Sequence, residues 1–236
     1  LIARFDDIVT ASEAASAIIA ERLLPCTLEI MDSQATKAVA EYIGEDLGAG
    51  SILLVEFDGT KSLCQEDASK ASGILQERFE CDVELELEPQ DREKLWRARR
   101  EVLPALTRLR PIVLLEDVTV ARSKLPEMVD AINLIAQKYE VEVAIFGHAG
   151  DGNLHPAYLI EDNRDALKRA KVAIAETMRA CLDLDGTISG EHGIGVEKMP
   201  YLKLELGRAG YEVMKAVKNA FDPHGIMNPG KMFYEE

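Results

Sequence analysis

The chain has 236 residues, of which 47% are hydrophobic and 29% charged, so it is long enough for one large or two small globular domains. Its formal net charge of −15 at pH 7 argues against nucleic-acid binding and against electrostatic docking on anionic membranes. No apolar run approaches the roughly 18 residues of a membrane span and no signal peptide opens the chain, which predicts a cytoplasmic location.

In the first half of the chain, predicted strands and helices alternate. Apolar or alternating runs predict the strands, and apolar stripes behind capping residues predict the helices. In chain order these are a strand at 1–10, a helix at 12–24 capped by Ser12, a strand at 27–31, a helix capped by Asp32 or Ser33, a strand at 51–57, a helix at 65–79, a strand at 82–88, and a helical basic segment at 90–110 that Pro104 interrupts. The strict alternation at 82–88 indicates one solvent-exposed face, which is typical of antiparallel sheets.

The second half predicts a strand–helix–strand–strand–helix order, which is that of a split βαβ unit. Its elements are a strand at 111–120, a helix at 123–139, strands at 141–146 and 157–160, a helix at 164–182, and then loop, helix and a Pro/Gly-rich tail. We therefore predict an α+β fold: an antiparallel sheet with helices on one face, two ferredoxin-like halves at about 1–110 and 111–182, and a helical C-terminal segment at 183–236.

The stretch GHAGDGNLHP at 147–156 joins two apolar strands, which predicts a β-hairpin with a Gly/Asp/Asn turn. His148 would end one strand and His155 would begin the other, so both imidazoles could face one point. Two converging imidazoles suit a borderline divalent metal such as zinc. The alternative interpretation is that both histidines are structural or surface residues near a turn.

A second stretch, GTISGEHGIG at 186–195, places four glycines around an adjacent Glu-His pair. Glu191 offers an oxygen ligand and His192 an acid–base group, while the glycines allow the backbone to approach a ligand closely. Together with the hairpin this makes three protein ligands, the number typical of a catalytic metal site. The alternative is a helix C-cap at Gly186 followed by a flexible loop.

Two further stretches carry weaker signals. Trp96-Arg97-Ala98-Arg99-Arg100 lies on a predicted helix, either as a solvated basic face or as an arginine fork for a substrate carboxylate. The tail at 221–231, FDPHGIMNPGK, has the composition of turns and a helix stop, and we expect His224 to be structural or exposed.

Six stretches in this order resemble the C-terminal domain of FAD-linked oxidases, in the branch of glycolate oxidase D-subunits, D-lactate dehydrogenases and D-2-hydroxyglutarate dehydrogenases. They are PCTLEIMD, WRARR, EDVTV, GHAGDGNLHP, GTISGEHGIG and FDPHGIMNPGK. Nothing in the chain corresponds to that family's flavin-binding domain, and the first residue is Leu1. We therefore expect a fragment, inactive alone, that forms the substrate- and metal-binding half of a larger flavoenzyme whose upstream domain holds most of the FAD.

The resemblance also implies roles for single residues. A divalent metal, expected to be zinc, would be held by His148, His155 and Glu191. His192 would take a proton as hydride passes from the α-carbon of a 2-hydroxyacid to the flavin. Arg99 would bind the substrate carboxylate, and Asn228 would lie near the flavin.

The substrate and the partners are constrained less. Leu103, Leu115 and Ala157 stand where the 2-hydroxyglutarate branch has polar residues for a distal carboxylate, which favours D-lactate or glycolate. The expected partners are the flavin-binding domain, redox subunits that could hold the protein at the inner membrane, and a second copy in a homodimer. Two rival functions stay open at this point: a self-contained zinc hydrolase, and a non-catalytic binding module on the same fold.

Overall fold

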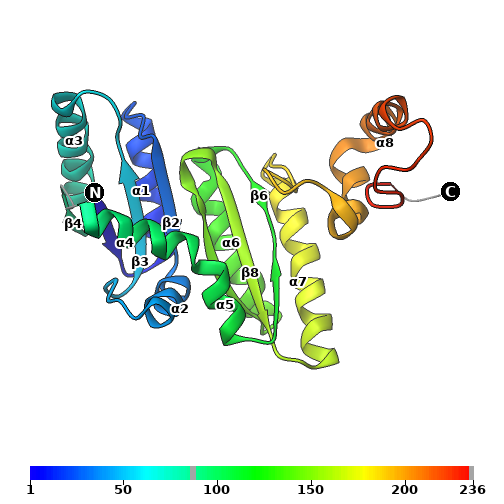
Figure 1. Ribbon diagram of the computed structural model, residues 1–236, viewed down its shortest axis with the longest axis horizontal. Coiled ribbons are helices and arrows are strands. Elements are labelled where there is room, and N and C mark those ends of the chain that lie inside the picture. Colours follow the sequence, from blue (N-terminus) through cyan, green and yellow to red (C-terminus); the bar gives the residue numbers. More distant parts are fainter. Residues whose placement is uncertain (86–88, 234–236) are drawn as a thin grey trace.

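An antiparallel sheet forms the centre of the structure (Figure 1), a computed structural model that describes residues 1–85 and 89–233. Its strands are β1 (Ile2–Phe5), β2 (Thr27–Met31), β3 (Ser51–Glu56), β4 (Asp82–Glu84), β5 (Ile112–Leu115), β6 (Val118–Thr119), β7 (Glu142–His148) and β8 (Asn153–Ile160). Across the sheet they follow the order β4-β1-β3-β2-β7-β8-β5, and β6 also pairs with β8. Because β2 pairs with β7, the two halves of the chain share one continuous sheet.

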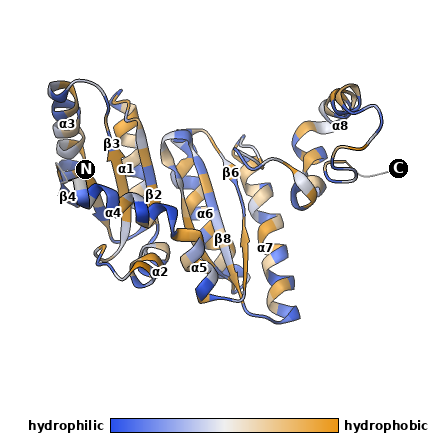
Figure 2. Ribbon diagram, viewed as in Figure 1, coloured by the Kyte–Doolittle hydropathy of each residue, from blue (hydrophilic) through white to orange (hydrophobic). Residues whose placement is uncertain are grey.

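Helices cover both faces of this sheet. They are α1 (Ile8–Ala20), α2 (Ser33–Ile43), α3 (Lys61–Phe79), α4 (Pro89–Arg100), α5 (Val102–Leu109), α6 (Leu125–Lys138), α7 (Arg164–Asp183) and α8 (Gly195–Phe221), with short 3-10 helices η1 (Arg122–Lys124) and η2 (Ala149–Asp151). Helices α1, α3, α6 and α7 enclose one apolar core with the sheet, and α2, α4 and α5 enclose another on the opposite face. Helix α7 carries hydrophobic and hydrophilic residues in turn along its length (Figure 2), as a helix with one buried face should.

Strand β3 shows why the sequence builds two cores. Leu53 points into the first core, whereas Ile52 and Leu54 point into the second. Since successive side chains of a strand face opposite sides, burial on both faces requires the continuous apolar run seen here. The predicted α+β class and antiparallel sheet are confirmed. Helices on one face were an incomplete expectation, because α2, α4 and α5 cover the other.

Several predicted boundaries near the N-terminus are wrong. Strand β1 ends at Phe5, because Asp7 caps α1 by accepting the backbone N–H of Thr10 (2.9 Å). Ser12, the predicted cap, lies buried inside that helix. Helix α3 begins earlier than expected, since Thr60 caps it.

The segments around the basic helix also differ from the prediction. Helices α4 and α5 separate at Glu101, and Pro104 lies in the first turn of α5, where a missing backbone N–H is tolerated. The strand expected at 111–120 is divided into β5 and β6 by two buried acidic residues, Glu116 and Asp117. Of the strand expected at 82–88, β4 covers Asp82–Glu84, and residues 86–88 lie outside the described part.

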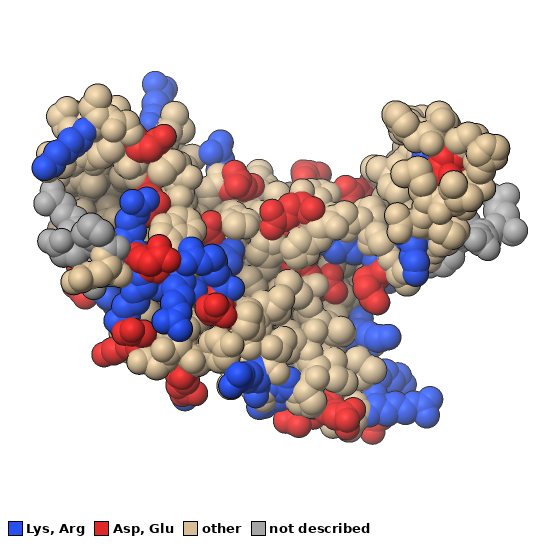
Figure 3. All heavy atoms as spheres, in the orientation of Figure 1, with Lys and Arg blue, Asp and Glu red and all other residues tan. Residues whose placement is uncertain are grey.

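The C-terminal residues form a lobe that stands apart from the sheet. Helix α8 is interrupted at Gly207, whose positive φ of 62° divides it into two helical segments. Figure 3 shows this lobe separated from the main body by a hollow. Within residues 1–85 and 89–233, no helix has the length and apolar character needed to cross a membrane.

Candidate metal centre

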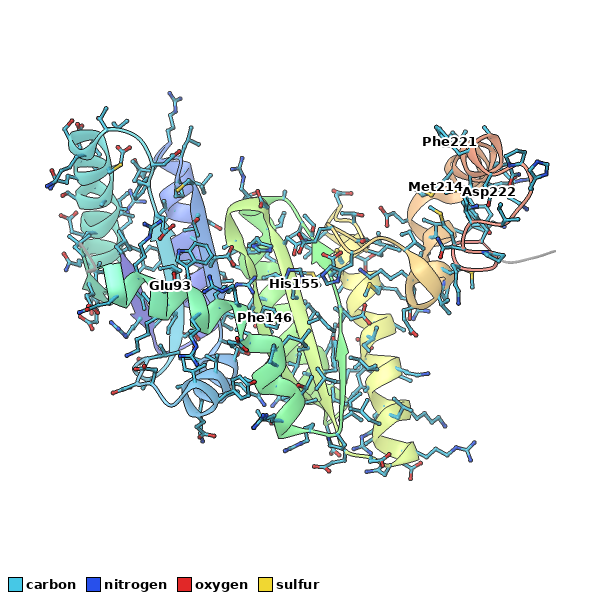
Figure 4. The ribbon with its side chains drawn as sticks, in the orientation of Figure 1. Glu93, Phe146, His155, Met214, Phe221 and Asp222 are labelled. Carbon is cyan, nitrogen blue, oxygen red and sulfur yellow. The ribbon has the colours of Figure 1, made fainter. Side chains whose placement is uncertain are left out.

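The predicted hairpin is formed by β7 and β8, and it brings two histidines to one face of the sheet. Phe146 lies opposite His155 and His148 opposite Asn153 in the strand register. The His148 and His155 rings meet edge to face with centroids 5.3 Å apart. Phe146 lies beside His155 near the middle of the molecule (Figure 4), with ring centroids 5.6 Å apart.

The turn of this hairpin requires glycine at one position. Gly152 has a φ of 73°, and a Cβ there would lie 2.1 Å from the carbonyl oxygen of Val120. The turn therefore packs directly on the segment after β6, with no room for a larger residue at position 152.

Glu191 reaches the histidines from the loop between α7 and α8. Its Oε1 lies 3.2 Å from Nε2 of His155 and 3.5 Å from Nε2 of His148. The three potential ligand atoms all lie within 4.8 Å of one another. This loop and the hairpin are distant in sequence, so it is the fold that brings together the three residues expected from the stretches at 147–156 and 186–195.

The donor set is one that zinc accepts, and two of its three separations match a tetrahedral zinc site. Nitrogen and carboxylate ligands bind zinc at roughly 2.0–2.1 Å, so the edges of a regular tetrahedron would be about 3.3 Å. The separations of 3.2 and 3.5 Å agree with that length. Since the Glu191 side chain is 53% exposed and that of His148 34%, a fourth position would face the accessible side.

The electrostatics of the two histidines differ. Burial, reinforced by the neighbouring His148 and His192, lowers the pKa of His155 to about 4, so its imidazole is neutral at pH 7 and can act as a ligand. For His148, a hydrogen bond with Glu29 raises the pKa. Glu29 Oε1 lies 2.6 Å from His148 Nδ1, which leaves Nε2 directed at Glu191.

His192, the predicted acid–base residue, lies beside this cluster. Its ring stacks on that of His155, with centroids 5.0 Å apart and planes 7° apart. Its Nε2 is 3.9 Å from Glu191 Oε1, and its side chain is 38% exposed. It can therefore meet a molecule bound at the cluster without being one of the three grouped ligands.

Arg99, the predicted carboxylate-binding residue, also borders the site. Its Nε donates a 2.6 Å hydrogen bond to Glu29 Oε2, and its guanidinium carbon lies 5.1 Å from the centre of the Phe146 ring. Asn228 comes after the end of α8, next to Met227, whose backbone N–H donates to Asp222 Oδ2 (2.9 Å), and it is not one of the three clustered residues. His224 is exposed in the same tail, as expected.

Asp117 anchors the loop that carries Glu191 and His192. Its buried Oδ2 accepts the backbone N–H of Glu191 (3.0 Å) and of His192 (2.8 Å), and the hydroxyl of Ser189 (2.9 Å). The Lys198 ammonium, also buried, donates to the Asp117 carbonyl oxygen at 2.9 Å. Although burial opposes ionisation, the hydrogen bonds from this loop hold the pKa of the Asp117 carboxyl well below its usual range.

Neither Glu29 nor Asp117 was identified from the sequence, although both lie in stretches that carried the resemblance. In both cases the sequence contains a local sign that the residue has a special role. Glu29 is a charged residue inside an apolar strand, and Asp117 interrupts an otherwise apolar one. An acidic residue at a buried strand position needs partners, and here those partners are site residues.

Comparison with known proteins gives one consistent family. Residues 1–232 match the family described as FAD linked oxidases, C-terminal domain. The whole chain aligns with glycolate oxidase subunit GlcD of Bacillus subtilis (strain 168) at 41% identity, over 51% of that protein. The mitochondrial D-lactate dehydrogenase (cytochrome) of Arabidopsis thaliana is 29% identical over 98% of this chain and 41% of its own length. The chain thus spans about half the length of these curated relatives.

A solved structure shares the fold. In p-cresol methylhydroxylase with substrate bound, the matching region covers 98% of this chain and 52% of that one, with a TM-score of 0.68 and 14% identity. At this identity the likeness shows the fold alone.

Proposed function

The chain belongs to the family of FAD-linked oxidase C-terminal domains, and on that premise we propose that it is the substrate- and metal-binding part of an FAD-dependent 2-hydroxyacid dehydrogenase. The reaction would convert the α-hydroxyl of D-lactate or glycolate into a keto or aldehyde group, with hydride transfer to the flavin. The observation that carries the proposal is the cluster of His148, His155 and Glu191 beside His192 and Arg99.

Each residue has a separate task in this proposal. A divalent metal held by His148, His155 and Glu191 would act as a Lewis acid that lowers the pKa of the substrate hydroxyl. Arg99 binds the substrate carboxylate through its terminal nitrogens. His192 accepts the hydroxyl proton at Nε2, while the hydride leaves the α-carbon for the flavin.

The apolar core beneath Phe146 supports a short substrate with a single carboxylate. Leu115 and Ala157 lie opposite each other in the β5–β8 pairing and belong to the same apolar core as Phe146. None of these three side chains could pair with a second, distal carboxylate, whose burial without a partner would be costly. Glycolate and D-lactate meet this limit, whereas 2-hydroxyglutarate does not.

The relatives are about twice as long as this chain, which bears on where the FAD is bound. Because the chain covers 41–51% of the two relatives compared above, we propose that a further part of the protein binds most of the FAD and meets the cluster from its accessible side. The relative from Bacillus subtilis is named as a subunit, which supports the proposal that redox partner subunits take the electrons onward.

The test is turnover in a protein that joins this chain to its flavin-binding half. Reduction of an artificial electron acceptor would be measured with D-lactate, glycolate and D-2-hydroxyglutarate. We expect turnover with one of the first two and at least tenfold lower kcat/KM with the third. The His192→Ala variant should lose turnover yet keep its metal. A preference for D-2-hydroxyglutarate would overturn the substrate proposal, and full activity of His192→Ala would overturn the role of that residue.

A further inference from the structure

Glu29 lies between two parts of the site that the proposed function keeps separate. It belongs to β2, and its side chain is 10% exposed. Oε1 lies 2.6 Å from Nδ1 of His148, and Oε2 accepts a 2.6 Å hydrogen bond from Nε of Arg99. One buried carboxylate therefore contacts both a metal-ligand candidate and the substrate-binding arginine.

The chemistry of the two contacts requires a carboxylate. Arg99 can only donate at Nε, and His148 donates at Nδ1 when its Nε2 is free to act as a ligand. A carboxylate accepts at both oxygens, whereas a carboxamide of the same shape accepts at one end and donates at the other. Glutamine at this position would set a donor against either His148 or Arg99.

These contacts also determine how Arg99 faces the site. Glu29 holds Nε, and Phe146 lies under the guanidinium plane at 5.1 Å. Among the described residues no hydrogen bond or ion pair involves the two terminal nitrogens of Arg99. The two terminal nitrogens of Arg99, which can bind a carboxylate through two hydrogen bonds, are therefore available, in an orientation set by Glu29.

We propose that Glu29 is a positioning residue that fixes the metal ligand His148 and the carboxylate-binding Arg99 relative to each other. It thereby sets where the hydroxyl and the carboxylate of one 2-hydroxyacid must lie. This inference rests on the proposed function and adds a residue that the family motifs did not nominate. In this proposal both oxygens of Glu29 are engaged by Arg99 and His148, so its carboxylate acts through these two neighbours rather than on the substrate.

The chain contains a matched control one strand away. Glu56, at the end of β3, accepts hydrogen bonds from Arg92 Nε (2.6 Å) and from Trp96 Nε1 (3.0 Å). Both donors lie on α4, the helix that also carries Arg99. Glu56→Gln therefore disturbs a carboxylate that ties α4 to the sheet, without touching His148 or Arg99.

The experiment uses Co²⁺ as a spectroscopic probe for the metal site in this chain. Co²⁺ affinity is measured by competition with a chelator, and D-lactate is then titrated while the visible cobalt absorption is recorded. For Glu29→Gln we expect Co²⁺ affinity to fall by tenfold or more, as is typical when the partner of a ligating histidine is changed. The D-lactate concentration that half-changes the spectrum should rise at least tenfold, and Glu56→Gln should stay within about twofold of wild type in both.

The outcomes distinguish a wrong role for Glu29 from a wrong proposed function. If wild type binds Co²⁺ and responds to D-lactate, but Glu29→Gln matches Glu56→Gln, the role of Glu29 is wrong and the proposed function stands. If wild type binds no Co²⁺, both fail. Should Glu29→Gln not fold, Glu29→Asp keeps the charge but shortens the side chain by one methylene. It should weaken the same two readouts, and wild-type values for it would refute the inference.

Discussion

Replacing Asp117 with alanine should release the loop that carries Glu191 and His192. The substitution removes the acceptor for both backbone N–H groups and leaves the buried ammonium of Lys198 without its carboxylate partner. Removing one member of a buried ion pair costs roughly 3–5 kcal/mol. Because Lys198 keeps its hydrogen bond to the backbone carbonyl of residue 117, we expect the lower part of this range.

The loss is measured as the free energy of unfolding in urea at pH 6, and the loop is followed by hydrogen exchange. We expect about 3 kcal/mol of destabilisation, with exchange at residues 189–193 accelerated beyond that of the sheet. Metal affinity should fall at least tenfold, since Glu191 loses its fixed position. Glu116→Gln is the control: Glu116 is also buried and adjacent in sequence, but it makes no contact with this loop that the structure shows. Unchanged protection of 189–193 in Asp117→Ala would refute the anchoring role.

Three further predictions concern single positions. In Gly190→Ala, the new Cβ would lie 1.9 Å from Nδ2 of Asn153, so the loop must move and metal affinity measured by chelator competition should fall. Alanine at Gly73 in α3, where a Cβ meets nothing within 4 Å and the backbone is helical, should leave that affinity close to wild type. Arg99→Lys keeps the charge but loses the planar pair of donors, so KM for the acid in the complete enzyme should rise by roughly tenfold or more, while the chain's metal content stays the same. Burial raises the pKa of Glu116 to about 7, above its value of 4.5 in the unfolded chain. The contribution of Glu116 to stability is therefore present below pH 4.5 and lost as pH rises through 7. In urea unfolding, the free energy of unfolding of Glu116→Gln should fall less than that of wild type between pH 4.5 and 7, and an unchanged pH profile would contradict this.

The features that the sequence predicted best depend on local patterns. The hairpin at 147–156 follows from two apolar runs around a turn of small and polar residues, and its strands pair in a register that puts His148 and His155 on the same face of the sheet. The position of Glu191 beside them depends on long-range folding, and it was suggested by the glycine-rich Glu-His stretch and the family resemblance rather than by periodicity. Local rules were weakest where two residues compete for one role, as when Asp7 rather than Ser12 caps α1.

The residues that the sequence did not nominate owe their roles to distant partners. Glu29 and His148 are 119 positions apart, and Asp117 and His192 are 75 apart. No periodicity links positions at such distances. The buried setting of Asp117 nonetheless has a local trace, because two acidic residues break an apolar run that would otherwise form one strand.

The central claim is that His148, His155 and Glu191 together hold one divalent metal. Its most direct test is the metal content of the purified chain after equilibration with zinc and removal of unbound ion, compared with that of His155→Ala and of His224→Ala. We predict one zinc per chain for wild type and for His224→Ala, whose histidine lies in the exposed tail, and loss of the metal in His155→Ala. Zinc retained at one per chain by His155→Ala, or no stoichiometric zinc in wild type, would contradict the account.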